Sequence, residues 1–339
     1  MKTRPLKIAM SRLFMESPEA VLSGEFIAGA LSISRQSVWR IVQELVDEGF
    51  AIETLPQKGY RLLSAPLYDL APSHLGARLL RDCPWGGDIA VHDSLPSTQE
   101  EAKRLGRSGE TDGLVVIAEE QTRGRGRRDR SWVSPKGTGL YFSVYFRPKL
   151  YPGALQLVNL AAGLAVMEGV ERSLGVALSL KWPNDLLLRG KKICGILSEA
   201  SSDSEVIRDC CTGIGLNIAP PEAKIAREGL ENAAYLAASV DEVDRGALVA
   251  AILPLFAGYV AELVTNAAAV LSRYRLACDT LGRLVTVHTD GEIFRGTAVE
   301  IGSSGELVLA LGDERRAFYA ADVVHATPAA TTEQDGERE

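Results

Sequence analysis

Arginine and glycine are concentrated in one segment of the chain, from Gln121 to Trp132. The eight residues from Arg123 to Arg130 contain five arginines and two glycines. Alternating glycine lets the backbone approach a ligand closely, and each guanidinium group binds two oxygens of a phosphate or carboxylate. We therefore predict a flexible loop that clamps an anion. Taken alone, these residues also fit a solvated basic loop or a nonspecific nucleic-acid arm.

Other anion-binding, nucleophilic and metal-binding motifs are missing from the sequence. It has no Gly-x-x-x-x-Gly-Lys-Ser/Thr segment, and Gly124-x-Gly126 leads into further arginines instead of a third glycine and a helix. The four histidines are isolated, and the five cysteines show no Cys-x-x-Cys spacing. We therefore predict reduced thiols and no metal site. Any anion chemistry must rest on arginine, lysine and backbone amides.

The bulk composition is that of a globular protein with two or three domains. The chain has 339 residues and a net charge of −7, so DNA binding must come from a local basic patch. The N-terminus is basic without an apolar signal segment, and the most apolar run, residues 154–170, contains Asn159 and two glycines. We expect a cytoplasmic protein with no membrane span.

Residues 1–66 have the pattern of a winged helix-turn-helix. We expect helices over residues 6–16, 24–31 and from Arg35 onward, the last two capped by Ser23 and Ser34, and strands over 51–54 and 60–63. The third helix would bury Val38, Ile41, Leu45 and Val46. Its start and the wing supply the candidate DNA contacts, which are Arg35, Gln36, Ser37, Arg40 and Lys58. Eight Lys/Arg face seven Asp/Glu here, so a small helical docking domain is the alternative.

Alternating helix and strand signals over residues 67–278 predict a larger α/β region. We expect helices over residues 74–82, 98–107, 152–174 and 245–278, and strands over 113–119, 139–146, 177–182, 185–188, 192–198 and 206–217. From residue 279 short strands broken by Asp290-Gly291 and Ser304-Gly305 predict a small antiparallel barrel or sandwich that ends near residue 327. Residues 328–339 lack a hydrophobic anchor, and we expect them to be disordered.

In their order and spacing, four motifs resemble the signature of the biotin–protein ligases. They are Gly124-Arg125-Gly126-Arg127-Arg128-x-Arg130-x-Trp132, Lys181-Trp182-Pro183-Asn184-Asp185, Lys192-x-x-Gly195-Ile196-Leu197-x-Glu199 and Gly213-x-Gly215-x-Asn217-Ile218, with Ser97-Thr98 upstream. The N-terminal winged helix extends the resemblance to the bifunctional ligases that also repress the biotin operon. It implies an α+β multidomain fold: a winged helix-turn-helix (1–66), an α/β catalytic domain with a mixed sheet (67–278) and a small SH3-like β-barrel (279–327).

The resemblance implies that biotin and MgATP form biotinyl-5′-adenylate, which then acylates a lysine of a carrier protein. ATP with Mg²⁺ would be a co-substrate, biotin a substrate, and no tightly bound cofactor is expected. By resemblance, Lys192 and Arg127 are the catalytic residues that offset repulsion between the biotin carboxylate and the α-phosphate, and Lys181 assists. Ser97 could also serve as a helix cap, and Trp132 as a wall residue. The implied biotin and adenylate contacts are Ser97, Thr98, Gln99, Gln121, Arg125, Gly126, Arg127, Lys192 and Gly195.

Three positions depart from the family pattern. Gln99 stands where asparagine usually follows Ser-Thr, Arg123 where a small residue is common, and Asp129 where glycine usually follows the paired arginines. Asp129 could pair with Arg128 or Arg130 and lower the charge and flexibility of the loop. We expect the activity to survive these changes.

The implied partners are the biotin carboxyl carrier protein, operator DNA and a second copy of the chain. A two-fold dimer would place two recognition helices on an inverted repeat. Two other functions stay open: a lipoate or octanoyl transferase, and a ligand-sensing transcription factor without ligase activity. The complete arginine signature argues against the first, and Lys192 together with that segment argues against the second.

Overall fold

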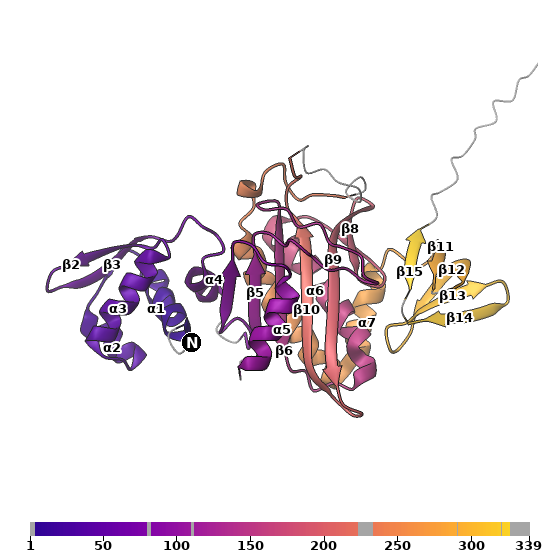
Figure 1. Cartoon of the computed structure of the whole chain (residues 1–339), viewed down its shortest axis with the longest axis horizontal. Coiled ribbons are helices and arrows are strands. Elements are labelled where there is room, and N and C mark those ends of the chain that lie inside the picture. Colours follow the sequence, from indigo (N-terminus) through magenta and orange to yellow (C-terminus); the bar gives the residue numbers. More distant parts are fainter. Residues whose placement is uncertain are drawn as a thin grey trace, which may run out of the picture.

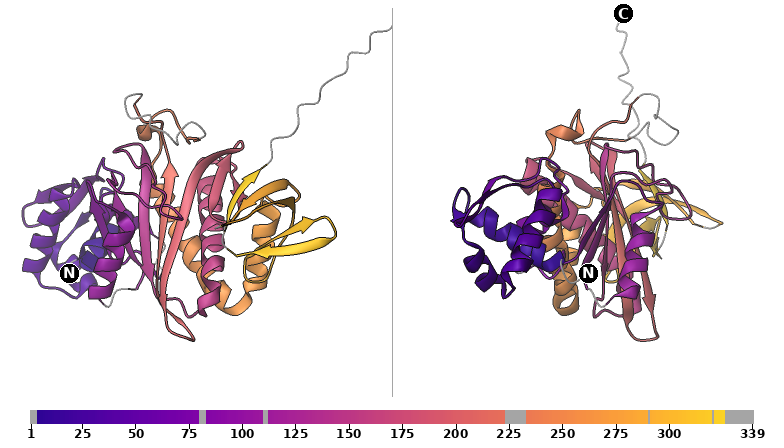
Figure 2. Two further views of the ribbon diagram at one scale, coloured as in Figure 1. Left: turned by 45° about the vertical axis from the view of Figure 1, so that its right-hand side comes forward. Right: turned by 60° about the vertical axis from the view of Figure 1, so that its left-hand side comes forward.

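The computed structural model describes residues 4–79, 83–109, 112–222, 233–289, 291–319 and 321–325. Figure 1 shows three parts in a row along the longest axis, with the N-terminal helices at one end and the last strands at the other. The two further views in Figure 2 show the large central sheet standing between them. The predicted tail, residues 328–339, lies outside the described residues.

The N-terminal part is a winged helix-turn-helix, as predicted. The hydroxyls of Ser23 and Ser34 cap two of its helices by accepting hydrogen bonds from the backbone N–H groups of Phe26 and Ser37. Its three strands form an antiparallel sheet in the order β1-β3-β2, and the β2–β3 turn is the wing. The elements are α1 (Arg4–Glu16), β1 (Val21–Leu22), α2 (Gly24–Leu31), α3 (Arg35–Asp47), β2 (Ala51–Leu55) and β3 (Gly59–Ser64).

One detail of the predicted α3 stripe is wrong. Val46 is exposed, and Val42 is buried in its place beside Val38, Ile41 and Leu45. Val42 lies one helical turn after Val38 and therefore on the inner face, whereas Val46 lies at its edge.

The central part is built on a seven-stranded sheet in the order β4-β5-β6-β10-β9-β8-β7. β4 is parallel to β5 and the other neighbours are antiparallel, so the sheet is mixed, as predicted. The four-residue strand β4 was missed in the sequence. The elements are α4 (Pro72–Arg78), β4 (Ile89–His92), α5 (Thr98–Ser108), β5 (Leu114–Ala118), β6 (Gly139–Phe146), η1 (Pro152–Ala154), α6 (Leu155–Leu174), β7 (Ser179–Lys181), β8 (Asp185–Leu188), β9 (Lys191–Ser202), β10 (Ile207–Asn217), η2 (Val240–Glu242) and α7 (Arg245–Ala277).

The two faces of this sheet are covered differently. Leu140, Phe142 and Val144 of β6 pack into a large core with α6 and α7, while Tyr145 and Ala102 pack together on the opposite face, under α5. By length and composition α6 with its preceding turn and α7 could each cross a membrane, but 72% and 50% of their most apolar windows are buried inside this fold. α5 lies over β5, β6 and β10, so it covers only part of its face.

The C-terminal part is a small antiparallel sheet in the order β14-β13-β12-β11-β15. Its closure into an SH3-like barrel stays a prediction. Trp182 of the central part anchors this sheet, because its buried indole N–H donates to the Gly305 carbonyl (2.8 Å) and its backbone N–H to the Thr280 hydroxyl (3.0 Å). The strands are β11 (Leu284–His288), β12 (Ile293–Ile301), β13 (Leu307–Leu311), β14 (Glu314–Phe318) and β15 (Asp322–His325).

Candidate functional site

One cavity collects the side chains that the sequence motifs identify. It lies on the sheet face opposite α6 and α7, between β6, β9 and β10 and the arginine segment. The segments that line it are far apart in the chain, and the pairing of β6 with β10 places two of them, Ser143 and Gly213, side by side. All nine predicted biotin and adenylate contacts line this cavity: Ser97, Thr98, Gln99, Gln121, Arg125, Gly126, Arg127, Lys192 and Gly195.

Glycines form the floor of the cavity. Gly195 of β9 is the register partner of Gly215 of β10, and the Trp132 indole lies over both. A Cβ atom on Gly195 would lie 2.9 Å from the Trp132 ring, and one on Gly215 would lie 2.4 Å from its Nε1. Real Cβ atoms do not approach that closely, so Trp132 can lie against the sheet only because these two positions are glycine.

Thr98 and Gln121 form a polar wall beside this floor. Gln121 Oε1 accepts hydrogen bonds from the Thr98 backbone N–H (2.9 Å) and hydroxyl (3.1 Å), and its Nε2 donates to the Ser134 hydroxyl (2.9 Å). The Thr98 hydroxyl lies 2.8 Å from that of Ser143. The wall therefore presents donors and acceptors in fixed positions. Ser97 is buried at the N-cap position of α5 but makes no side-chain capping bond there.

Gln99, the first departure from the family pattern, is bound to the sheet. Its side-chain Nε2 donates to the carbonyls of Leu197 (3.0 Å) and Cys211 (3.1 Å), on β9 and β10. Its Oε1 lies toward Gly213, at the edge of the cavity. Gln99 thus joins α5 to the two strands that carry the glycine floor.

The arginine segment folds as a tight hairpin rather than an open loop. The Trp132 N–H donates to the Gly124 carbonyl (2.9 Å), and the Gly126 N–H donates to the Arg130 carbonyl (2.7 Å). Arg128 and Asp129 make the turn with φ angles of 52° and 56°. Aspartate tolerates this left-handed conformation better than most residues, which explains how Asp129 stands where the family usually has glycine.

Two cations of the cavity are held by carboxylates. Lys192 Nζ lies 2.7 Å from Asp185 Oδ1 and 5.2 Å from the centre of the Trp132 ring. Arg125 lies 2.9 Å and 3.2 Å from the two oxygens of Glu199. These pairs keep the cations oriented at the cavity wall without burying an uncompensated charge.

Arg127 has a different environment. It donates to two neutral oxygens, the Asn184 side chain (3.4 Å) and the Ala321 carbonyl (3.1 Å). Burial lowers the pKa of Arg127 from its usual value, and the neighbouring Arg128 adds to this effect. A guanidinium group stays charged nevertheless, so Arg127 places a partly compensated positive charge inside the cavity.

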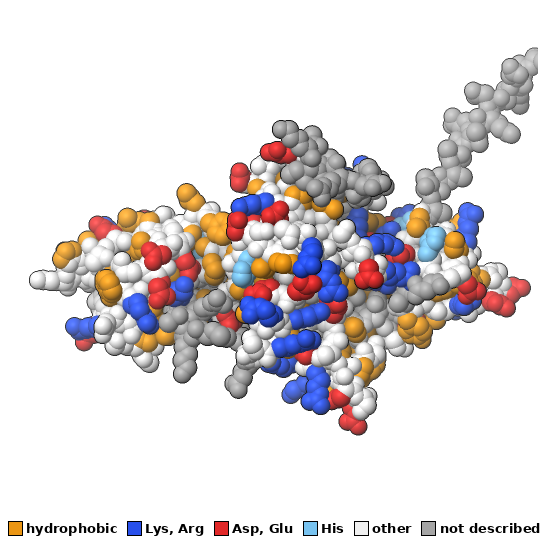
Figure 3. All heavy atoms as spheres, in the orientation of Figure 1, with side chains coloured by type: hydrophobic (Ala, Val, Ile, Leu, Met, Phe, Trp, Pro, Cys, Tyr) orange, Lys and Arg blue, Asp and Glu red, His pale blue; other side chains and the backbone are white. Residues whose placement is uncertain are grey.

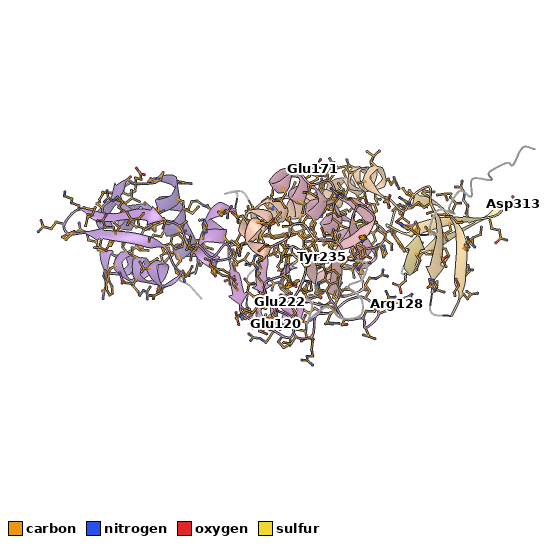
Figure 4. All side chains as sticks on the ribbon, turned by 90° about the horizontal axis from the view of Figure 1, so that it is seen from above. Glu120, Arg128, Glu171, Glu222, Tyr235 and Asp313 are labelled. Atoms are coloured by element: carbon orange, nitrogen blue, oxygen red, sulfur yellow. The ribbon has the colours of Figure 1, made fainter. Side chains whose placement is uncertain are left out.

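The C-terminal sheet closes one side of the site. Asp322 of β15 pairs with Arg130 and lies 3.5 Å from Arg128, which Figure 4 shows at the boundary between the central and C-terminal parts. Sequence reasoning missed Asp322, because the residues of β15 give no clear strand signal and the contacts of Asp322 with Arg128 and Arg130 span 194 and 192 positions. A second cavity follows this boundary, and Lys181 lines it. Burial lowers the pKa of Lys181 from its usual value.

The predicted DNA contacts lie in the N-terminal part, far from this cavity. Arg35 and Lys58 line one groove between the start of α3 and the wing. The side chains of Gln36 and Arg40 are exposed, while the Ser37 hydroxyl lies 2.9 Å from that of Ser34 at the helix start. On the face drawn in Figure 3, Lys and Arg side chains gather over α5 and toward the C-terminal sheet more than on the N-terminal part.

The two arginines among the predicted DNA contacts are already paired. Arg35 lies 2.7 Å from Glu25, and Arg40 lies 3.8 Å from Glu44. Exposed ion pairs of this kind contribute little free energy. These carboxylates therefore hold the two guanidinium groups only weakly.

Known proteins resemble the chain over nearly its whole length. Three family models match it: "HTH domain" over residues 7–61, "Biotin/lipoate A/B protein ligase family" over 91–217 and "Biotin protein ligase C terminal domain" over 280–326. The "Bifunctional ligase/repressor BirA" of Bacillus subtilis (strain 168) is 32% identical over 328 residues, which cover 94% of this chain and 98% of that protein.

A second relative and a solved structure cover the ligase portion. The "Biotin--[acetyl-CoA-carboxylase] ligase" of Mycobacterium tuberculosis is 32% identical over 227 residues, 66% of this chain and 82% of its own length. The biotin protein ligase from Aquifex aeolicus in complex with biotin and ATP superposes with a TM-score of 0.59 at 26% identity, covering 70% of this chain and 99% of that chain.

Proposed function

The chain belongs to the family of bifunctional biotin–protein ligases and repressors, and on this premise we propose that it attaches biotin to a carrier protein and represses transcription. The convergence of all nine predicted contacts on one cavity, with the half-buried guanidinium group of Arg127 inside it, carries the ligase proposal. Biotin and ATP are its substrates, and Mg²⁺ enters with ATP.

The chemistry has two steps. An oxygen of the biotin carboxylate attacks the α-phosphorus of ATP, the bond from that phosphorus to the bridging oxygen breaks, and pyrophosphate leaves. The amine of the carrier lysine then attacks the acyl carbon and loses a proton, and AMP leaves with the electron pair of the broken bond. The first step brings two anions together, so it needs fixed positive charge at the reacting oxygens.

We assign the polar wall to the ureido ring of biotin and the cations to the reacting groups. The ring would lie over the glycine floor, with Thr98 and Gln121 as hydrogen-bonding partners and Trp132 as the apolar wall. Lys192 would exchange Asp185 for the carboxylate and α-phosphate. Arg127, which is held by neutral oxygens, would face the phosphate without giving up an ion pair.

Lys192 provides the test of the ligase proposal. Replacing Lys192 with Gln should lower the rate of adenylate formation by about 100-fold or more, because one fixed positive charge at the phosphate is lost. Biotin, MgATP and an apo carrier domain are mixed with each variant, and the label is detected with streptavidin. Lys191→Gln, at the exposed neighbouring position, serves as the matched control. Failure of the unaltered chain to label the carrier, or transfer of lipoate in place of biotin, would refute the proposal.

The repressor function rests on the winged helix-turn-helix. We propose that adenylate binding favours a homodimer, whose two recognition helices bind an inverted repeat. Replacing Arg40 with Ala should weaken operator binding and leave ligation unchanged. Gel shifts with and without biotinyl-AMP measure the first effect, and unchanged DNA affinity would remove Arg40 from the interface.

The remaining assignments complete the proposal. The acceptor is the biotin carboxyl carrier protein and the location is the cytoplasm. The parts are a DNA-binding domain over residues 1–66, a catalytic domain over 67–278 and a C-terminal domain over 279–327.

A further inference from the structure

The short helix α4 stands between the DNA-binding part and the central sheet (Figure 1). On one side, Leu75 and Leu79 are buried in the core of the central part. On the other side α1 packs so closely that a Cβ atom on Gly76 would lie 2.6 Å from the side chain of Ile8. α4 is therefore the surface through which the two parts meet.

Side chains of the DNA-binding part cap both ends of α4. Its own N-cap residue, Ala71, supplies no capping side chain. Instead, Glu48, the residue that ends the recognition helix α3, accepts a hydrogen bond from the Ser73 backbone N–H (3.1 Å) and pairs with Lys7 of α1. These groups are largely shielded from water, so the contact is stronger than an exposed ion pair.

At the other end of α4, one arginine satisfies three backbone carbonyls. Arg12 of α1 donates to the carbonyls of Gly76 (3.1 Å), Ala77 (3.4 Å) and Leu79 (3.2 Å). The last turn of a helix leaves such carbonyls without partners inside the helix, and a cation is favoured beside them. Arg12 thus does for the C-terminus of α4 what Glu48 does for its N-terminus.

α4 is in turn fixed to the central part by a two-pronged ion pair. The two terminal guanidinium nitrogens of Arg78 donate to the carboxylate of Asp244 (2.9 Å and 2.8 Å), the residue that caps the N-terminus of α7. The recognition helix is therefore connected to α7 through Glu48, α4 and Asp244. The direct chain connection is less constrained, since Leu67 in the linker is fully exposed.

We propose that Glu48 and Arg12 are positioning residues for DNA binding. By clamping α4 at both ends, they fix the orientation of the recognition helix relative to the central part. In the dimer this orientation sets the distance between the two recognition helices, and so the spacing of operator half-sites that the protein accepts. The inference rests on the proposed repressor function.

The test uses the full-length chain with biotin and MgATP. An operator is selected from random duplex DNA with the unaltered protein, and its two half-sites are then moved apart or together by about two base pairs. Arg12→Ala and Glu48→Ala should bind the selected operator about tenfold more weakly, because the clamp no longer orients the domain before binding. They should also discriminate less between spacings, and bind a single half-site as the unaltered protein does.

Three controls separate this role from a loss of folding. Glu48→Gln keeps an acceptor for the Ser73 N–H, so its affinity for the operator should be closer to that of the unaltered protein than the affinity of Glu48→Ala is. Arg172→Ala removes an exposed arginine of α6 that pairs with Glu168, and should change neither DNA binding nor spacing. Biotin transfer to the carrier should be unchanged in every variant.

Small-angle X-ray scattering gives a readout without DNA. Arg12→Ala and Glu48→Ala should broaden the distribution of interatomic distances at its long-distance end. Unchanged scattering together with an unchanged spacing preference would overturn the clamp. If the clamp variants alter the scattering but the unaltered protein selects no DNA, the repressor function is refuted and the assignment to DNA binding falls with it.

Discussion

The glycine floor makes a sharp prediction for Gly215→Ala. The added Cβ atom would lie 2.4 Å from Trp132 Nε1, so the indole must move by about 1 Å to reach the 3.4 Å at which ordinary contact begins. The backbone cannot yield easily, because Gly215 lies between β6 and β9, paired with Tyr141 and Gly195. The displacement therefore falls on Trp132 and on the cavity that it lines.

A shift of about 1 Å in a positioning group lowers a rate by on the order of 100-fold. We expect Gly215→Ala to lower kcat/KM for biotin in adenylate formation by roughly 10- to 100-fold. For Gly195→Ala the added atom would lie 2.9 Å from the Trp132 ring, so we expect a smaller displacement of the indole and a smaller loss of kcat/KM. Biotin-dependent pyrophosphate exchange measures the first step without the carrier.

Gly258→Ala is the matched control, since an added Cβ atom there meets nothing within 4 Å. It lies in α7, where alanine should raise stability by up to about 1 kcal/mol. Thermal unfolding of all three variants separates a local shift from a loss of fold. If Gly215→Ala keeps full kcat/KM while remaining folded, Trp132 does not lie against the floor during the reaction, and the geometry assigned to the site is wrong.

Three further outcomes test other parts of the structure. Arg127→Gly should release biotinyl-AMP, which would be seen as biotin labelling of bystander lysines. Unchanged release would show that Arg127 does not retain the adenylate. Arg245→Met leaves the Asp69 and Glu119 carboxylates without their buried partner and should cost roughly 3 kcal/mol in urea unfolding; a loss below about 1 kcal/mol would contradict this. Burial and Lys181 lower the pKa of His325 from 6.5 to about 4, so the unfolded chain binds the extra proton and stability should fall as pH drops from 6.5 toward 4. In His325→Gln, this pH-dependent loss should disappear.

Local sequence patterns were sufficient to predict a helix or strand whose stabilising contacts lie within or next to the element itself. Ser23 and Ser34 each cap a helix whose start they predict, because the capping bond spans only three residues. The strands β5 and β6, which consist almost wholly of apolar residues, were likewise predicted, and both are fully buried. The short strands β4 and β15 were not, since each is defined by its neighbours in the sheet.

Residue types and their spacing are enough to identify the chemistry available to this protein: an arginine-rich segment, Lys192 and a set of glycines at family spacing. How these groups act together depends on tertiary contacts. Gly195 and Gly215 become a floor because β9 and β10 pair in that register, and Trp132 then lies across them. Asp322 reaches the arginine segment only when the C-terminal sheet docks. Such contacts join distant parts of the chain, so no local spacing records them.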